Sequence, residues 1–97
     1  MFSVHPEVQP LSQCITICNQ RGLHARAAVK LSKLASQFTA KIEVCRNGMS
    51  VSCLSIMGLM MLAATQGGTI EIRAYGPDAE KAITATATLI SHGFDED

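Results

Sequence analysis

The sequence predicts an α+β domain in which a four-stranded antiparallel sheet is covered on one face by three helices. Three observations predict this fold class. Apolar and polar residues alternate in four short segments, as they do in half-buried strands. Between these segments apolar residues recur at intervals of three and four, which is typical of amphipathic helices. Asn47-Gly48 separates two of the strand-like segments and is a strong signal for a hairpin turn. The resulting order is β-α-β-β-α-β-α.

The first half of the chain predicts two strands and a helix. Ile15 and Ile17 alternate with polar residues between positions 11 and 18, which predicts the first strand. The helical pattern begins at Ala25 and continues through Leu31 to Phe38. The second strand is expected at 41–46.

The second half repeats the alternation of strand and helix after the hairpin. The third strand is expected at 49–53, the second helix at 56–64 and the fourth strand at 69–75. Ser55 precedes the second helix in an N-cap position, and Gly67 and Gly68 follow its end. Asp78 is the expected N-cap of the third helix, whose apolar face includes Ala82, Ile83 and Ala87.

Length and composition restrict the classes of function. The chain has 97 residues, equal numbers of acidic and basic residues and no tryptophan, so a single domain without a nucleic-acid-binding surface is expected. No apolar stretch approaches the about 20 residues of a membrane span, and the N-terminus lacks the pattern of a secretory signal, which favours the cytoplasm. We expect a flexible leader over 1–11, a domain over 12–92 and an acidic tail over 93–97 that is frayed at its end.

The four cysteines give no sign of a metal or redox site. Cys14, Cys18, Cys45 and Cys53 include no Cys-x-x-Cys pair, so neither a metal nor another cofactor is expected. We interpret these thiols as small apolar fillers in a reducing compartment.

The segment Gly22-Leu23-His24-Ala25-Arg26 lies where a strand-like run gives way to a helical one. Unpaired backbone N–H groups and the helix dipole favour anions at such a position. A neutral imidazole can act as a nucleophile toward phosphorus, and the planar guanidinium of Arg26 matches phosphate oxygens. His24 alone would more often be a capping or surface histidine, but its neighbours favour a phosphoryl acceptor. His5 and His92 lack this context and are expected to be solvated.

Three motifs together resemble the HPr family, the histidine-containing phosphocarriers of the phosphoenolpyruvate-dependent phosphotransferase system. They are 22–26, Asn47-Gly48 and Ser55-Ile56-Met57-Gly58-Leu59-Met60, and the similarity extends over about 12–92. The resemblance implies an open-faced β-sandwich. It also implies a carrier, without enzymatic activity of its own, that takes a phosphoryl group on His24 from phospho-Enzyme I and passes it to EIIA-type acceptors. Arg26 and the backbone at Ala25 and Arg26 would hold the phosphate.

The same resemblance assigns roles to the second motif. Ser55 matches the serine that HPr kinase/phosphorylase modifies in some family members, although a serine at a helix start is also an ordinary N-cap. Ile56, Met57 and Met60 match an exposed apolar surface that meets partner proteins. The alternative for Met57, Met60 and Met61 is that they belong to the core. A monomer is expected, because it suits a carrier that meets two partners in turn. A regulatory docking module controlled through Ser55, with little transfer through His24, is the alternative function.

One position departs from the family pattern. Ala27 follows Arg26 where the family usually has proline, whose fixed φ would stiffen the first helical turn. The alanine form resembles the nitrogen-type regulatory branch more than the sugar-uptake branch, but the sequence leaves the acceptor and the physiological output open.

Overall fold

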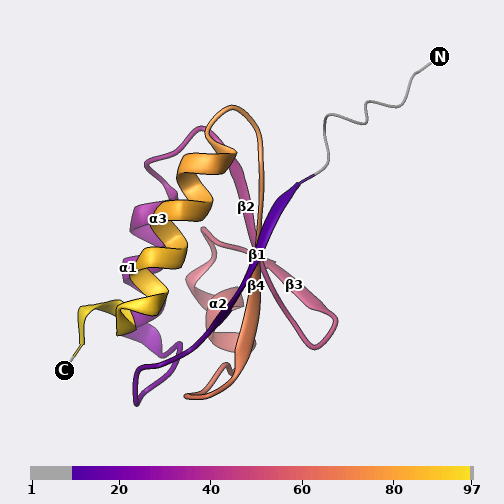
Figure 1. Ribbon diagram of the computed structural model, residues 1–97. Helices are drawn as coiled ribbons and strands as arrows, with labels where there is room; N and C mark the ends of the chain where they lie inside the picture. Colours follow the sequence, from indigo (N-terminus) through magenta and orange to yellow (C-terminus); the bar gives the residue numbers. More distant parts are fainter. Residues whose placement is uncertain (1–9, 97) are drawn as a thin grey trace.

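Four strands and three α-helices form two layers in the computed structural model, which describes residues 10–96 (Figure 1). The strands are β1 (Leu11–Thr16), β2 (Lys41–Arg46), β3 (Met49–Ser52) and β4 (Thr69–Tyr75). The helices are α1 (Ala25–Ala35), α2 (Ile56–Met61) and α3 (Ala79–Ser91), and a short 3-10 helix, η2 (Gly93–Asp95), ends the described chain. The predicted fold class and element order are confirmed. The expected leader over 1–11 falls almost wholly outside the described residues.

The sheet has the strand order β1-β4-β2-β3, and all its pairings are antiparallel. The central strand β4 places Ile72 opposite Gln13 of β1 and opposite Val44 of β2. The hairpin between β2 and β3 turns at Asn47 and Gly48, both of which have positive φ. The hairpin predicted from this dipeptide is therefore confirmed.

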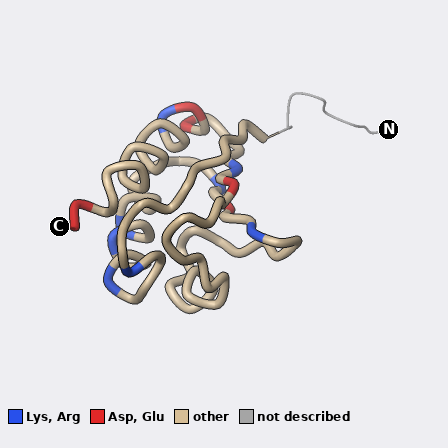
Figure 2. The backbone as a smooth tube through the Cα atoms, turned by 60° about the horizontal axis from the view of Figure 1, so that its bottom comes forward, with Lys and Arg blue, Asp and Glu red and all other residues tan. Residues whose placement is uncertain are grey.

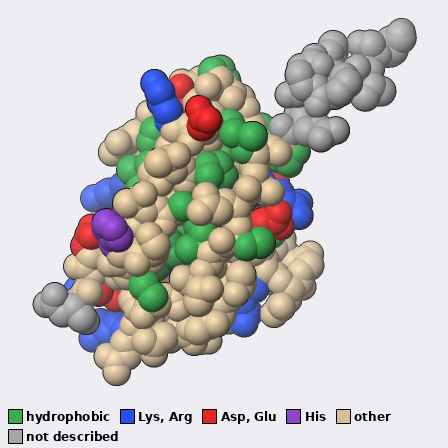
Figure 3. All heavy atoms as spheres, in the orientation of Figure 1, with side chains coloured by type: hydrophobic (Ala, Val, Ile, Leu, Met, Phe, Trp, Pro, Cys, Tyr) green, Lys and Arg blue, Asp and Glu red, His purple; other side chains and the backbone are tan. Residues whose placement is uncertain are grey.

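The core lies between the sheet and the helices, which cover the same face of the sheet (Figure 1). Alternate strand residues point into it, and the central ones are Val44, Ile70 and Ile72. Helix α1 contributes Leu31 and α3 contributes Ile90, both with no exposed surface. On the side that α3 presents, hydrophobic side chains gather in the middle and charged ones lie toward the edges (Figure 3).

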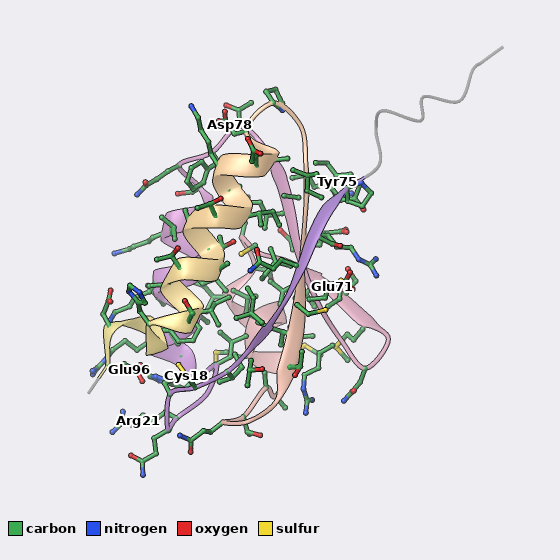
Figure 4. The ribbon with its side chains drawn as sticks, in the orientation of Figure 1. Cys18, Arg21, Glu71, Tyr75, Asp78 and Glu96 are labelled. Carbon is green, nitrogen blue, oxygen red and sulfur yellow. The ribbon has the colours of Figure 1, made fainter. Side chains whose placement is uncertain are left out.

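The other face of the sheet is polar. Glu71 and Arg73 of β4 form an ion pair there at 3.0 Å, and Lys41 lies over the ring of Tyr75. Figure 4 shows Glu71 and Tyr75 on this open side, away from the helices. Alternation therefore places one set of strand residues in the core and the other in solvent.

The cysteine interpretation is correct for one residue and wrong for two. Cys53 is fully buried, and burial raises the pKa of its thiol to about 12. Cys14 and Cys18 are exposed, and Cys45 is half-buried. Cys14 and Cys45 both lie opposite Glu71 in the register, so pleating turns them to the uncovered face of the sheet.

One helix end and one helix cap differ from those predicted. Helix α2 ends at Met61 rather than near position 64, because Ala63 adopts a left-handed φ of 52° that ends a helix without glycine. Asp78 lies at the N-cap position of α3, but its carboxylate does not cap the helix. It accepts a hydrogen bond from the amide of Thr39 at 2.7 Å and so ties α3 to the loop before β2.

None of the helices in residues 10–96 is both long enough and apolar enough to cross a lipid bilayer.

Candidate phosphoryl-acceptor site

His24 lies at the N-cap position of α1 with an extended backbone, and its carbonyl accepts the first helical hydrogen bond from Ala28 at 2.8 Å. Its side chain makes no capping hydrogen bond and keeps 22% of its surface exposed. The ring is therefore available at the surface instead of being used to complete the helix.

The loop before α1 is fixed by backbone contacts. Gly22 has a φ of 65°, and its amide donates to Asn19 O at 3.1 Å. The next amide, of Leu23, donates to Ala64 O at 2.9 Å, which joins this loop to the segment after α2. A Cβ at Gly22 would lie 2.4 Å from Ala64 O, so only glycine fits this approach. Both the positive φ and the close approach to Ala64 require glycine at position 22, and the position of His24 depends on this loop.

The exposed first turn of α1 carries Ala25 and Arg26, whose amides have no hydrogen-bond acceptor among residues 10–96. Arg26 lies against a hollow of about 430 Å³. The side chains around this hollow are polar or charged and are those of Gln20, Arg21, Arg26, Lys30, Asp95 and Glu96. Several Lys and Arg positions, blue in Figure 2, lie on the same side of the molecule as the acidic C-terminal segment, which is red. Three cations, two of which the sequence analysis did not identify, therefore border one hollow together with two carboxylates.

The C-terminal segment adds a contact to His24 that the sequence analysis did not predict. Glu96 Oε2 lies 2.5 Å from His24 Nε2, and the Glu96 side chain keeps only 15% of its surface exposed. Asn19 Nδ2 donates to the other carboxylate oxygen at 3.0 Å and also to Gly22 O. Figure 4 shows Glu96 and Arg21 at the same end of the molecule. Glu96 therefore packs against the site, whereas we expected Asp95 and Glu96 to be frayed.

A buried aromatic ring fixes this segment. Phe94 has no exposed surface, and its backbone adopts a left-handed φ of 57°. Its carbonyl accepts a hydrogen bond from Lys30 Nζ at 2.7 Å. The contact between Glu96 and His24 joins residues 72 positions apart, which no local pattern signals. The one available signal was an apolar Phe94 in an otherwise acidic tail.

The pKa of the Glu96 carboxyl is lowered, chiefly because His24 and Asn19 donate hydrogen bonds to it, while desolvation opposes the shift. A lowered carboxyl pKa means that the contact contributes to stability at neutral pH and is lost as the pH falls through that lowered value. We predict that Glu96 titrates below the ordinary range of glutamate, and that His24→Ala moves its pKa upward. Carboxyl ¹³C NMR titration measures both values. Identical Glu96 titration in the two proteins would contradict the contact.

Ser55 occupies the N-cap of α2, and its Oγ accepts a hydrogen bond from the amide of Gly58 at 2.9 Å. The capping role is therefore present, whether or not the residue is modified. The loop before it is tied to α1, because Ser32 Oγ donates to Leu54 O at 3.2 Å. The start of α2 thus packs beside the helix that His24 begins.

An apolar surface surrounds Ser55. Ile56, Met57 and Met60 are 40%, 71% and 42% exposed, so these residues are not core. Leu54 and Met61 are also exposed and extend the surface beyond the predicted residues. We call these five residues the α2 surface.

The comparisons with known proteins agree with one another. The sequence matches the family described as "PTS HPr component phosphorylation site" over residues 11–92. It is 45% identical to the phosphocarrier protein HPr of Cupriavidus necator, over 89% of this chain and 97% of that protein. It is 44% identical to the phosphocarrier protein NPr of Shewanella violacea, over 89% and 94%. The crystal structure of HPr-C-His from Thermoanaerobacter tengcongensis superposes with a TM-score of 0.86 at 39% identity, covering 90% of this chain and 98% of that one.

Proposed function

The chain belongs to the HPr family of phosphotransferase-system phosphocarriers, and from that premise we propose that His24 accepts a phosphoryl group from phospho-Enzyme I and passes it to an EIIA-type acceptor. The observation that carries the proposal is the position of His24. Its ring stays partly exposed at the start of α1 and does not cap the helix, and it contacts Glu96, one of the residues that line the hollow with Arg21, Arg26 and Lys30.

The chemistry requires little covalent help from the carrier. A lone pair of the imidazole attacks phosphorus, a nitrogen–phosphorus bond forms, and the donor keeps the electron pair of its broken bond. Phosphoryl transfer depends mainly on positioning and on stabilising charge on the equatorial oxygens. Arg26 and the amides of Ala25 and Arg26 are available for that purpose at the first turn of α1. We therefore propose a carrier and not an enzyme.

The α2 surface is the proposed docking surface for both partners. Exposed methionines adapt to different shapes, and an apolar surface of this kind favours protein contacts. Because the segment after α2 is joined to the residue before His24, through the hydrogen bond from the amide of Leu23 to Ala64 O, a partner seated on the α2 surface would bring its own phosphohistidine or acceptor residue toward His24. A monomer in the cytoplasm suits a shuttle that meets two partners in turn.

The proposal is tested by incubating the full chain with Enzyme I and phosphoenolpyruvate. One phosphate per chain, labile in acid and stable in base, is expected on His24. Enzyme I with an HPr of established activity is the positive control. The absence of labelling under conditions that label this control would refute the proposal.

The alternative is a regulatory docking module controlled by HPr kinase/phosphorylase through Ser55. The observation that favours it is the placement of an exposed apolar surface directly around the Ser55 cap. ATP-dependent labelling at Ser55 without labelling from phosphoenolpyruvate would support this alternative. Labelling of both His24 and Ser55 would indicate a phosphocarrier that is also regulated through Ser55.

Ser55→Asp is expected to keep the fold and to slow phosphoryl transfer to His24. Aspartate is as good an N-cap as serine, so the free energy of unfolding should change little. A negative charge amid the α2 surface disfavours an acidic partner face and should lower the association rate on the order of tenfold. The initial rate of His24 phosphorylation, measured in samples quenched at successive times with limiting Enzyme I, reports the effect. Ser55→Asn, which keeps a cap without charge, is the matched control; equal rates for Ser55→Asp and wild type would contradict the role of charge.

A further inference from the structure

The contact between Glu96 and His24 distinguishes the two nitrogens of the ring. Nε2 faces the carboxylate at 2.5 Å, whereas Nδ1 has no hydrogen-bond partner among residues 10–96. A carboxylate can only accept a hydrogen bond, so it selects the form of neutral imidazole that carries its proton on Nε2. The lone pair is then on Nδ1.

Glu96 is itself held from several sides. Asn19 donates to its second oxygen, and the backbone amide of Glu96 donates to Gly93 O at 3.1 Å. The preceding Phe94 is fully buried and is bonded to Lys30 through its carbonyl. A carboxylate fixed in this way can set the orientation of the imidazole as well as its protonation.

We propose that Glu96 is a positioning residue that holds the proton of His24 on Nε2 and directs the Nδ1 lone pair toward the incoming phosphorus. The inference rests on the proposed function and deepens it. Glu96 would act through His24 and would not touch the phosphoryl group.

The transfer step balances without a proton leaving the ring. The Nδ1 lone pair forms the new bond to phosphorus, and the donor retains the electrons of the bond that breaks. The ring becomes a phosphoimidazolium whose positive charge is shared with Nε2–H, next to the Glu96 carboxylate. When an acceptor removes the phosphoryl group, the electrons of the nitrogen–phosphorus bond return to Nδ1 and the starting form is restored.

The negative charge of Glu96 also opposes the approach of a phosphoryl group. Asp95 adds a second negative charge at the same hollow, but Arg21, Arg26 and Lys30 leave the hollow with one more positive than negative charge. Orientation and stabilisation of the ring cation are therefore expected to outweigh repulsion. We therefore expect that removal of the Glu96 carboxylate slows phosphoryl transfer.

The test uses the full chain with Enzyme I and phosphoenolpyruvate, and compares Glu96→Ala, Glu96→Gln and Glu80→Gln with the wild type. Glu96→Ala should lower kcat/KM for phosphorylation on the order of tenfold, as removal of an orienting partner commonly does. Glu96→Gln keeps an acceptor oxygen and should recover part of the loss. Glu80→Gln removes the same charge from an exposed position of α3 that does not line the hollow, and it should leave the rate unchanged.

Long-range ¹H–¹⁵N spectra of the unphosphorylated proteins provide a readout that a purely structural role would not change. The Nε2–H form of His24 should predominate in the wild type and in Glu80→Gln, and should decline in Glu96→Ala. An unchanged or faster rate in Glu96→Ala, or an unchanged ratio of the two ring forms, would overturn the proposal. If the wild type takes no phosphate, the proposed function fails and the transfer role of Glu96 fails with it, while the spectra still report whether the contact exists.

Discussion

His24→Ala should abolish phosphoryl acceptance from Enzyme I, with a loss of at least the order of 10³-fold in the rate of labelling. The loss is expected to be this large because, within residues 10–96, His24 is the one histidine at the start of α1. Arg26 and the helix amides can hold a phosphate but cannot form the bond. The measurement is incorporation of labelled phosphate from phosphoenolpyruvate.

The fold should survive this change. The His24 side chain does not cap α1, so its removal costs the helix no capping hydrogen bond. Thermal unfolding should therefore remain cooperative, and loss of labelling could not be attributed to an unfolded chain. His92→Ala is the matched control, because His92 is exposed near the end of α3 and should keep full activity. Normal labelling of His24→Ala would contradict the assignment.

Gly22→Ala should lower the free energy of unfolding by about 2 kcal/mol or more, through two separable causes. A left-handed φ of 65° is unfavourable for alanine, and the added Cβ would lie 2.4 Å from Ala64 O. The backbone must move to relieve that contact, which displaces the loop that positions His24. Labelling should therefore be slower even where the variant is fully folded. Urea denaturation and the labelling rate measure the two effects.

Gly48→Ala separates the causes. Gly48 has a φ of 80° in the hairpin turn, and nothing lies within 4 Å of a Cβ built there. Its replacement should cost only the conformational part, about 1 kcal/mol, and leave labelling unchanged. Equal destabilisation by the two substitutions would show that the approach to Ala64 does not matter.

The sheet and its helices could be predicted because each depends on local signals. Alternation at β2 and β4, the Asn47-Gly48 turn and the spacing of three and four in α1 all act within a few residues. His24, Arg26 and Ser55 could be singled out for the same reason, since each lies next to a helix start. Their functional roles remain proposals.

What the sequence did not reveal depends on contacts between distant segments. Asp78 was expected to cap α3, yet Thr39 competes successfully for its carboxylate. Ala63 ends α2 in a conformation that alanine seldom adopts, and nothing in the local composition marks it. The contact of Glu96 with His24 requires a turn through the buried Phe94, and tail composition alone favours fraying.

The shortness of α2 has a consequence for recognition. Six residues are far fewer than the about 12–15 at which an isolated helix is even marginally stable in water, and Leu59 is its only buried side chain. The helix is therefore maintained by the Ser55 cap and by a single hydrophobic anchor, and its amides should exchange with deuterium sooner than those of α1 or α3. Because few interactions fix the conformation of α2, the helix can adjust slightly to two different protein surfaces. The sheet and the helix that carry His24 stay rigid meanwhile.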